Sequence, residues 1–203
     1  MASTAPDHDE TQRRVFDVIV SLLGIAVLSP LLALIAALIK LESPGPILFC
    51  QKRIGKGGRT VELLKFRSMT EMAPEEQTVA DVENMDTFVF RPVGQKTAVG
   101  RALRACSLDE LPNLLNVLRG DLHLVGPRPD EPELVAQYRP EWRRRHDVKP
   151  GITGLAQING RTDLTYSEMM AYDLDYVERR PFARDVKIML KTLGVVLRRE
   201  GAR

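Results

Sequence analysis

Residues 15–39 read VFDVIVSLLGIAVLSPLLALIAALI and are almost wholly apolar. As a straight helix this segment would be about 37 Å long, which exceeds the roughly 30 Å hydrocarbon core of a bilayer. An acidic segment precedes it and no small-residue cleavage site follows, which argues against a signal peptide. It also lacks the polar stripe expected of a helix in a soluble protein. The sequence therefore predicts a helix that associates with a membrane.

Ser29-Pro30 lies in the middle of this segment. Proline removes a helical hydrogen bond and clashes with the preceding turn, which predicts a kink. We expect Ser29 to help satisfy the backbone groups that the proline leaves free. Because basic residues favour the cytoplasmic side, a single span would put one of the two flanking basic clusters on the wrong side. The residues alone leave a re-entrant helix and a kinked span as equal alternatives. The flanking basic residues are Arg13 and Arg14 before the segment, and Lys40, Lys52, Arg53, Lys56 and Arg59 after it.

The overall charge and the cysteines argue against two other classes of protein. The 203 residues carry 29 Lys+Arg against 27 Asp+Glu, without the basic excess of a nucleic-acid binder. Cys50 and Cys106 form neither a disulfide framework nor a metal-ligand pattern, which favours a reducing, cytosol-facing location. The length allows one domain with a core. We expect a polar tail at 1–12, the membrane helix at 13–40 and a single domain at 41–203.

Beyond the apolar segment, the pattern predicts a mainly helical α/β domain with one small β-hairpin. Residues 47–54 and 60–66 read as strands joined by residues 55–59. The joining run, GKGGR, lacks the Gly-Lys-Ser/Thr ending of a phosphate-binding loop, which favours a turn. Residues 70–96 are polar and poorly periodic and are expected to form a variable loop or a short helix. Apolar spacing predicts helices at 108–118, 131–145, 166–178 and 182–199.

Ser107 to Glu110 is the segment with the clearest chemical signal. Ser107 and Glu110 have the spacing of a capping box, and one interpretation is that they only cap a helix. The other is that Asp109 and Glu110 form a site at the positive end of a helix, where the dipole favours ionised carboxylates. Such oxygen ligands suit Mg²⁺, which binds through one or two carboxylates together with substrate phosphates.

Arginines on both sides of this pair favour the second interpretation. Arg101 and Arg104 precede it, and Gly126-Pro127-Arg128-Pro129 places another arginine in a rigid loop. Arginine matches phosphate oxygens bidentately, which lysine cannot do. Each arginine alone is typical of a protein surface. Together with the carboxylates they predict a phosphoryl-transfer site.

Several motifs in order resemble those of the bacterial monotopic phosphoglycosyl transferases, in the minimal form without a further membrane domain. The resemblance runs from about residue 13 to residue 197 and includes Ser29-Pro30 in the apolar segment. The other motifs are 43–47 (SPGPI) with Gln51 and Arg53, 65–69 (KFRSM), 107–113 (SLDELPN), Gly120-Asp121, 125–129 (VGPRP), 149–154 (KPGITG), and Gln157 with 159–161 (NGR).

The resemblance implies a specific reaction and location. A re-entrant helix that bends at Ser29-Pro30 would anchor the catalytic domain to the cytoplasmic face of the bacterial inner membrane. The enzyme would transfer a phosphosugar from a UDP-sugar to a polyprenyl phosphate, giving polyprenyl-diphospho-sugar and UMP. Asp109 would be the nucleophile, and Asp109 and Glu110 would hold Mg²⁺. The substrate-binding residues it implies are Lys65, Arg67, Arg104, Pro127, Arg128, Pro129, Gln157 and Arg161.

Two other functions and several features remain outside these motifs. The alternatives are a non-catalytic membrane scaffold and a soluble nucleotide-phosphate hydrolase with a membrane tail. His123 has no role in the motifs, and Cys106 is expected to be a packing residue. Tyr138 and Trp142, with the basic run 143–145, fit either the lipid headgroup region or a solvated helix face. The motifs specify neither the sugar nor the pathway, and a homodimer is compatible with them.

Overall fold

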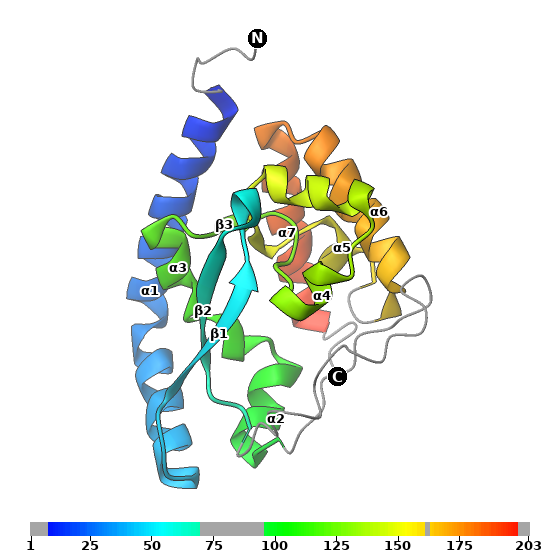
Figure 1. Ribbon diagram of the computed structural model, residues 1–203. Helices are drawn as coiled ribbons and strands as arrows, with labels where there is room; N and C mark the ends of the chain where they lie inside the picture. The colour runs from blue at the N-terminus through cyan, green and yellow to red at the C-terminus, as the bar shows by residue number, and fades with distance from the viewer. Residues whose placement is uncertain (1–7, 70–95, 161–162, 199–203) are drawn as a thin grey trace.

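The computed structural model describes residues 8–69, 96–160 and 163–198 (Figure 1). The elements are α1 (His8–Glu42), β1 (Leu48–Ile54), η1 (Lys56–Gly58), β2 (Thr60–Phe66), α2 (Ala98–Ala105), η3 (Leu108–Glu110), α3 (Asn113–Arg119), β3 (His123–Val125), α4 (Pro132–Ala136), η4 (Pro140–Asp147), β4 (Gly151–Thr153), α5 (Leu155–Ile158), α6 (Tyr166–Glu178) and α7 (Phe182–Arg198). The predicted loop at 70–96 lies outside the described residues except for Lys96.

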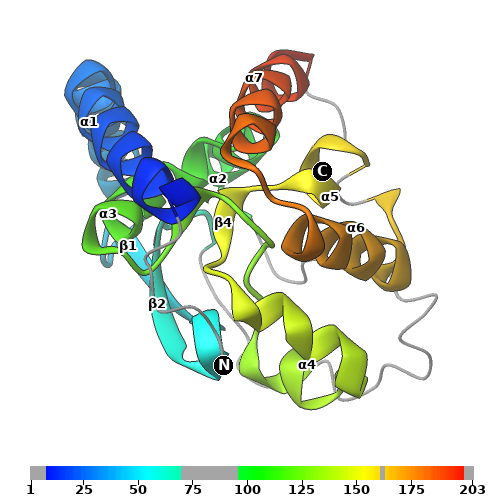
Figure 2. The same ribbon diagram turned by 90° about the horizontal axis from the view of Figure 1, so that it is seen from above.

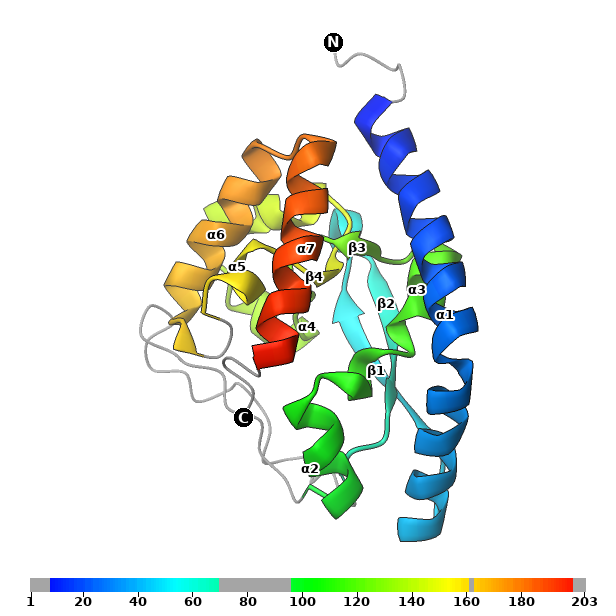
Figure 3. The same ribbon diagram turned by 180° about the vertical axis from the view of Figure 1, so that it is seen from behind.

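Helix α1 runs along one side of the molecule with α3 packed against it, and the β1–β2 hairpin lies next to α3 (Figures 1, 2 and 3). Helices α4 to α7 form the other side. The hairpin is antiparallel from the Leu48–Phe66 pair to the Ile54–Thr60 pair, as the sequence predicted. Between the two sides lies a small parallel sheet, β3–β4, which the sequence did not predict. The expected fold class, mainly helical with a small hairpin, is confirmed.

The helix predictions were correct where no proline interrupts the pattern. α6 has the predicted bounds, and α7 is described to Arg198. The segment predicted as one helix at 108–118 is two pieces, η3 and α3, because Pro112 stands between them at the N-cap of α3. The segment at 131–145 is likewise split, with Pro140 at the start of the 3₁₀ helix η4.

Three groups of buried side chains form the interior. The largest packs α3, β3, α6 and α7 around residues such as Val117 and Ile188. A second joins Ile35 and Ile39 of α1 to β2 and α2. The third is an aromatic cluster of Leu134, Tyr138, Trp142, Tyr166 and Met170. Tyr138 and Trp142 are therefore buried, so neither alternative for them, the lipid headgroup region or a solvated helix face, is correct, whereas Arg143 and Arg144 are exposed.

The polarity of the first half of α1 is inverted relative to a helix in a soluble protein. Arg13, Asp17 and Ser21, at i, i+4 and i+8, are buried against the domain. Apolar residues face outward, with Val27 75% exposed. Helix α1 is long and apolar enough to cross a membrane by length and composition. An exposed apolar face over a buried polar one is typical of a helix whose surroundings are lipid.

Helix α1 continues through Ser29-Pro30 as one helix from His8 to Glu42. Ser29 Oγ donates to the Ala26 carbonyl at 2.9 Å, which is the acceptor that the missing N–H of Pro30 would have bonded. The expected compensation by Ser29 is therefore confirmed. The structure does not show the sharp return of the chain that a re-entrant helix requires.

Polar contacts fix the N-terminal end of α1 to the domain. Arg13 Nε pairs with Asp185 of α7 at 2.6 Å, and Tyr176 donates to the other oxygen of Asp185 at 2.8 Å. His123, to which the sequence assigned no role, lies 2.5 Å through Nδ1 from Asp17 and 3.2 Å through Nε2 from Glu10. His123 therefore links β3 to α1.

We predict that the contacts of His123 with α1 stabilise the fold most in mildly acidic solution. Burial opposes protonation of His123, but the hydrogen bonds to Asp17 and Glu10 outweigh it and raise the pKa above 6.5. The stabilisation is therefore fully present below about pH 6.5 and is lost as the pH rises through the raised value. At pH 6, we expect His123→Gln to lower the free energy of unfolding by about 1–3 kcal/mol. The difference from wild type should shrink at pH 9.

Thermal unfolding of the detergent-held protein at both pH values measures this effect. His146→Gln is the matched control, since burial and Arg145 lower the pKa of His146 to about 4, below the tested range. Its difference from wild type should be the same at pH 6 and pH 9. If the stability difference between His123→Gln and wild type is also the same at pH 6 and pH 9, His123 is uncharged when it contacts Asp17 and Glu10.

Candidate active site

Ser107 turns the chain between α2 and η3 and so sets the direction of Asp109. Its backbone is left-handed, with φ 55° and ψ 24°, and it is the one non-glycine residue with positive φ in the described ranges. Such a conformation costs about 1–3 kcal/mol and is concentrated at functional sites. Its side chain does not cap η3, so the predicted capping box with Glu110 is wrong, because an N-cap needs an extended backbone. The neighbouring Cys106 is a partly buried free thiol.

Glu110 is held by two cations from distant parts of the chain. Arg128 Nη2 and Nη1 lie 2.5 and 3.2 Å from its two carboxylate oxygens, and Lys65 Nζ lies 3.4 Å from Oε1. Burial alone would raise the pKa of Glu110, but Arg128 and Lys65 outweigh it and hold the pKa well below its usual range. Burial lowers the pKa of Lys65 to about 8. Glu110 is therefore an ionised, fully paired carboxylate.

The pKa of Asp109 is shifted in the opposite direction. It is 8% exposed, and its ion pair is a long one, 3.9 Å from Oδ2 to Arg104 Nε. Burial, followed by the charge of Glu110, raises the pKa of Asp109. The expectation that a helix dipole stabilises its ionised form is therefore not met at this residue. Adjacent carboxylates whose pKa values are pushed apart are typical of pairs with separate chemical roles.

Asn116 of α3 fixes β2 beside the carboxylates. It is fully buried, its Oδ1 accepts from Leu64 N at 3.0 Å, and its Nδ2 donates to the Glu62 carbonyl at 2.7 Å. Both bonds hold the strand on either side of Leu63, and Lys65 follows directly. The position of the Lys65 ammonium next to Glu110 thus depends on a buried amide in the following helix.

Close packing of α2 against the end of β2 places Arg104. A Cβ atom on Gly100 would lie 2.0 Å from the Ser68 carbonyl oxygen, so glycine is required for this approach. Arg104 Nε then donates to Ser68 Oγ at 3.2 Å while its guanidinium faces Asp109. Ser68 thus orients an arginine beside the buried carboxylate.

The loop Gly126-Pro127-Arg128-Pro129 follows β3 at the carboxyl end of the small parallel sheet. Gly126 N donates to the Thr153 carbonyl at 2.8 Å, and Gly151 N donates to the Pro127 carbonyl at 2.9 Å. A Cβ on Gly126 would come within 2.6 Å of the Lys149 carbonyl oxygen, so the glycine permits this approach. Ligands commonly bind beyond the carboxyl ends of parallel strands, and here the loop presents Arg128 to Glu110.

Behind this loop lies Arg145, whose guanidinium is buried in a network of polar groups. Its Nη2 donates to the Arg128 carbonyl at 2.5 Å and to Asp173 Oδ2 at 2.6 Å, and its Nη1 pairs with Asp130. Burial raises the pKa of Asp173 to about 6. Two buried tyrosine hydroxyls also donate to Asp130, those of Tyr138 and Tyr166. The network fixes the backbone on both sides of Pro129 and so positions Arg128.

A narrow cavity lies between β2, Glu110 and the loop that carries Arg128, and its volume is about 270 Å³ when the space open to solvent is included. Several buried polar atoms of the described residues have no hydrogen-bond partner, and one of them, Asn113 Oδ1, lines this cavity. Arg104 Nη1 and both amide atoms of Gln157 are also unpaired but do not line it, and others such as Arg13 Nη1 and Asp173 Oδ1 lie elsewhere. Because buried polar atoms are nearly always paired, the unpaired Asn113 oxygen favours a polar ligand in this cavity. The cationic lining fits a ligand that carries phosphate groups. The polar lining residues are Arg53, Lys65, Glu110, Asn113 and Arg128, with Pro129 beside them.

Residues 8–199 match the sequence model of the family described as bacterial sugar transferase. The chain belongs to this family. The resemblance drawn from its motifs is thereby confirmed.

Three relatives of this sugar transferase show the range of known activities. The UDP-glucose:undecaprenyl-phosphate glucose-1-phosphate transferase of Caulobacter vibrioides is 43% identical over 203 residues, which cover 95% of this chain and 72% of the relative. The exopolysaccharide production protein ExoY of Sinorhizobium fredii is 38% identical over 94% of this chain and 87% of its own length. The undecaprenyl-phosphate galactose phosphotransferase of Salmonella typhimurium is 36% identical over 94% of this chain but only 41% of the relative.

The structure brings together most of the residues that the motifs implied for the transferase site. Asp109 and Glu110 meet the side chains of Lys65, Arg104 and Arg128. Pro129 lines the cavity, and Pro127 accepts the bond from Gly151 at the base of the loop. Gln157 packs near this loop, since a Cβ on Gly154 would approach both Gln157 Oε1 and the Gly126 carbonyl.

One implied residue, Arg67, points away from the carboxylates, and another, Arg161, is not described by the structure. The Arg67 guanidinium points to the C-terminal end of α1, where it donates to the Pro44 carbonyl at 2.7 Å and the Ser43 carbonyl at 2.8 Å. It fixes the helix end and does not contact the carboxylates, because β2 ends at Phe66 and the strand alternation stops there.

Sequence reasoning did not single out three residues that the structure places at the cavity or behind it. Arg53 pairs with Glu131 at 3.0 Å and lines the cavity, and Asn113 contributes an unpaired oxygen. Both residues belong to the motifs quoted above, and this membership could have identified them as candidate site residues. Arg145 gave no such signal, because it lies in a run of three arginines that is typical of a solvated surface.

The oxygen donors of the carboxylate pair fit Mg²⁺ in part. No group of three or more His, Cys, Asp or Glu side chains that could hold a metal occurs in the part of the chain that the structure describes. Both oxygens of Glu110 are already paired with cations, whereas those of Asp109 are not closely paired. Because Mg²⁺ commonly keeps only one or two protein carboxylates and takes phosphate oxygens for the rest, Asp109 suits a cation that arrives with a diphosphate, and Glu110 would have to give up part of its pairing to join it.

Proposed function

We propose that the protein transfers a phosphosugar from a UDP-sugar to a polyprenyl phosphate, as the first membrane step of glycoconjugate assembly. The observation that supports this most strongly is the contrast between the two carboxylates: Glu110 is locked in ion pairs, while Asp109 is buried and loosely paired. A poorly solvated carboxylate is a better nucleophile than one that water stabilises. The names of the relatives, which include undecaprenyl-phosphate phosphotransferases for glucose and galactose, support the same reaction class.

In the first step, an Asp109 oxygen attacks the sugar-bearing phosphorus of the donor. The new bond joins the carboxylate to phosphorus, the bond from that phosphorus to the bridging oxygen breaks, and UMP leaves with the electron pair. Arg104 and Arg128 stabilise the charge on the phosphoryl oxygens, and Arg128 is held in place by Glu110. The product of this step is a phosphosugar joined to Asp109 as an acyl phosphate.

In the second step, the phosphate oxygen of the lipid attacks the same phosphorus. The bond to Asp109 breaks, the carboxylate is regenerated, and the polyprenyl-diphospho-sugar is released. Two displacements let two bulky substrates use one small cavity in turn. Asp109 and Glu110 would hold Mg²⁺ with the donor diphosphate, where the ion would neutralise charge on the phosphate oxygens.

The exposed apolar face of α1 supports a location at the membrane. Val15, Ile19 and Val27 are more than half exposed, while the polar side chains of the same helix face the domain. We propose that this helix lies in the bacterial inner membrane as a re-entrant anchor, with the domain on the cytoplasmic face. A lipid acceptor could then reach the cavity without leaving the bilayer.

Release of UMP by the detergent-held or nanodisc-held protein tests the reaction. The assay contains undecaprenyl phosphate, Mg²⁺ and a panel of UDP-sugars that begins with UDP-glucose and UDP-galactose. We expect sustained turnover with one sugar, and loss of turnover when the lipid phosphate or Mg²⁺ is omitted.

The two alternative functions give different results in the same assay. A hydrolase would release UMP continuously without the lipid acceptor. A scaffold would be inactive with every donor although folded, and either result would overturn the proposed transfer. Turnover that persists in a chelator would contradict the role of Mg²⁺ while leaving the transfer intact.

A further inference from the structure

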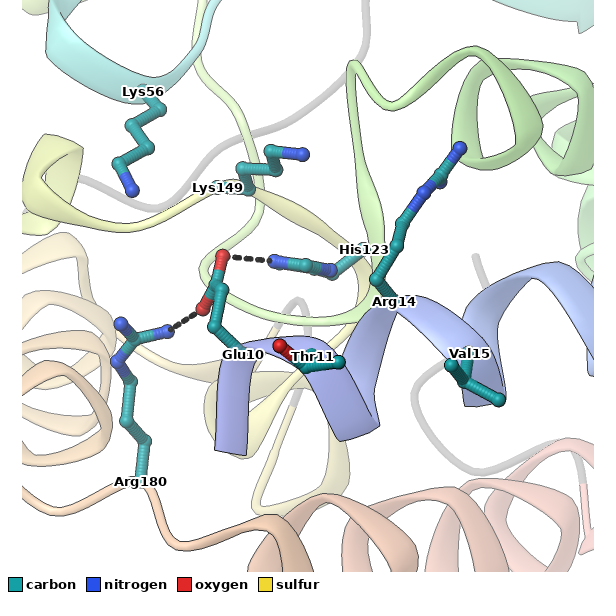
Figure 4. A pocket seen from close by; sticks show the side chains of 8 residues that line it. All are labelled: Glu10, Thr11, Arg14, Val15, Lys56, His123, Lys149 and Arg180. Carbon is teal, nitrogen blue, oxygen red and sulfur yellow. Dashed lines mark hydrogen bonds and ion pairs between the residues drawn. The ribbon is translucent and has the colours of Figure 1, made fainter. Parts of the chain in front are cut away.

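A second, wider pocket lies at the N-terminal end of α1 (Figure 4). Its volume is about 1080 Å³ including the open mouth, and none of its lining residues lines the transferase cavity. Four cations from four segments of the chain line it: Arg14, Lys56, Lys149 and Arg180. Convergence of like charges from separate elements is unfavourable without an anion among them, so this basic pocket requires an explanation.

The carboxylate and the arginines of the basic pocket are already paired. Glu10 accepts from Arg180 Nη1 at 3.2 Å and lies 3.2 Å from His123 Nε2 (Figure 4). Arg14 donates to the carbonyls of Val117 and Leu118 at 2.6 and 2.7 Å, which neutralises the end of α3. These contacts hold the arginines in place and leave a net positive pocket around them.

The two lysines are the groups that remain for a ligand. Neither Lys56 nor Lys149 forms an ion pair or a side-chain hydrogen bond within the described ranges, and both side chains extend into the pocket (Figure 4). A Cβ atom placed on Gly120 would lie 3.7 Å from Lys149 Nζ and 3.9 Å from Arg14 Cζ. The ammonium of Lys149 and the guanidinium of Arg14 thus lie close together beside Gly120.

We propose that the basic pocket binds the phosphate group of an anionic lipid headgroup. A phosphate carries the charge and the several acceptor oxygens that two ammonium groups and an arginine can satisfy together. The lipid is favoured over a soluble phosphate because Val15, the first residue of the apolar segment, is among the lining residues and is 54% exposed. A headgroup bound here would have its acyl chains directed along the exposed face of α1.

This assignment rests on the proposed membrane position of α1 but not on sugar transfer, so its test contains no sugar donor. The full chain in an uncharged detergent is titrated with dihexanoyl phosphatidylglycerol, dihexanoyl phosphatidylcholine or inorganic phosphate, and binding is followed by ³¹P NMR. We expect saturable binding of the phosphatidylglycerol that weakens with added salt. Phosphatidylcholine, which has the same chains and no net charge, should bind at least tenfold more weakly.

Charge-matched variants locate the binding. Lys56→Gln with Lys149→Gln should weaken phosphatidylglycerol binding at least tenfold. Lys52→Gln with Arg143→Gln removes the same charge from exposed positions outside the pocket and should change it less than twofold. Glu10→Gln removes the carboxylate of the pocket and should strengthen binding.

Each remaining outcome contradicts the proposal. Inorganic phosphate that binds as tightly as the lipid would overturn the lipid assignment. Equal loss of binding in both charge pairs would show a nonspecific surface effect, and absence of saturable binding in the folded wild type would overturn the site itself. Normal UMP release in the same preparation would show that such a failure concerns the pocket and not the transferase.

Discussion

Replacing Asp109 by asparagine is expected to reduce phosphosugar transfer at least about 10³-fold, as removal of a covalent nucleophile does in other enzymes. Asparagine keeps the size of the side chain but has no anionic oxygen with which to attack phosphorus. The fold should survive, because the ion pair of Asp109 with Arg104 is long and contributes little. UMP release with the lipid acceptor measures the loss. Asp121→Asn is the matched control, since Asp121 accepts a hydrogen bond from Asn116 away from the cavity.

A donor labelled in its sugar phosphate separates the covalent mechanism from direct transfer. Without the lipid acceptor, the wild type should retain label on the protein, up to one equivalent, and Asp109→Asn should retain none. Adding undecaprenyl phosphate should move the label into lipid. If Asp109→Asn still turns over at a rate near that of wild type, the covalent intermediate is excluded, although transfer by direct attack of the lipid phosphate would stand.

The carboxylate site could be predicted because its residues are close in sequence or lie in rigid, recognisable segments. Asp109 and Glu110 are adjacent, and the two prolines around Arg128 restrict where that arginine can lie. The electrostatic difference between the two carboxylates could not be predicted in the same way. It arises because Lys65 and Arg128, which are 63 residues apart in the sequence, both pair with Glu110. Asp109 has no cation as close, so burial determines the direction of its pKa shift.

The features that the sequence did not reveal depend on short elements and on tertiary partners. Strands β3 and β4 have three residues each, too few for an alternating pattern, yet they position the loop that carries Arg128. The left-handed conformation of Ser107 could not be predicted, because glycine and not serine is the residue that usually adopts it. The apolar run of α1 was clear, but its buried polar stripe depends on partners such as His123 and Asp185.

The role of Arg145 also depends on tertiary partners that the sequence does not reveal. Its replacement is expected to have the largest effect on the free energy of unfolding. Arg145→Met fills similar volume but leaves the carboxylates of Asp130 and Asp173 buried without their cation. Loss of one partner from such a network costs about 3–5 kcal/mol. Transfer should also fall in the molecules that remain folded, because the Arg128 carbonyl loses its donor.

Arg144→Met is the matched control, one residue away in the sequence. Arg144 pairs with Glu178 at 3.1 Å while both side chains are more than half exposed, so its loss should change the free energy of unfolding by less than about 0.5 kcal/mol. Urea unfolding in an uncharged detergent, followed by the fluorescence of Trp142, the single tryptophan, measures both. Adding Asp173→Asn to Arg145→Met should recover part of the loss, because one unpaired charge is removed. Equal stability of Arg145→Met and Arg144→Met would mean that the buried network does not hold the loop, and that Arg128 is positioned by Glu110 and the parallel sheet alone.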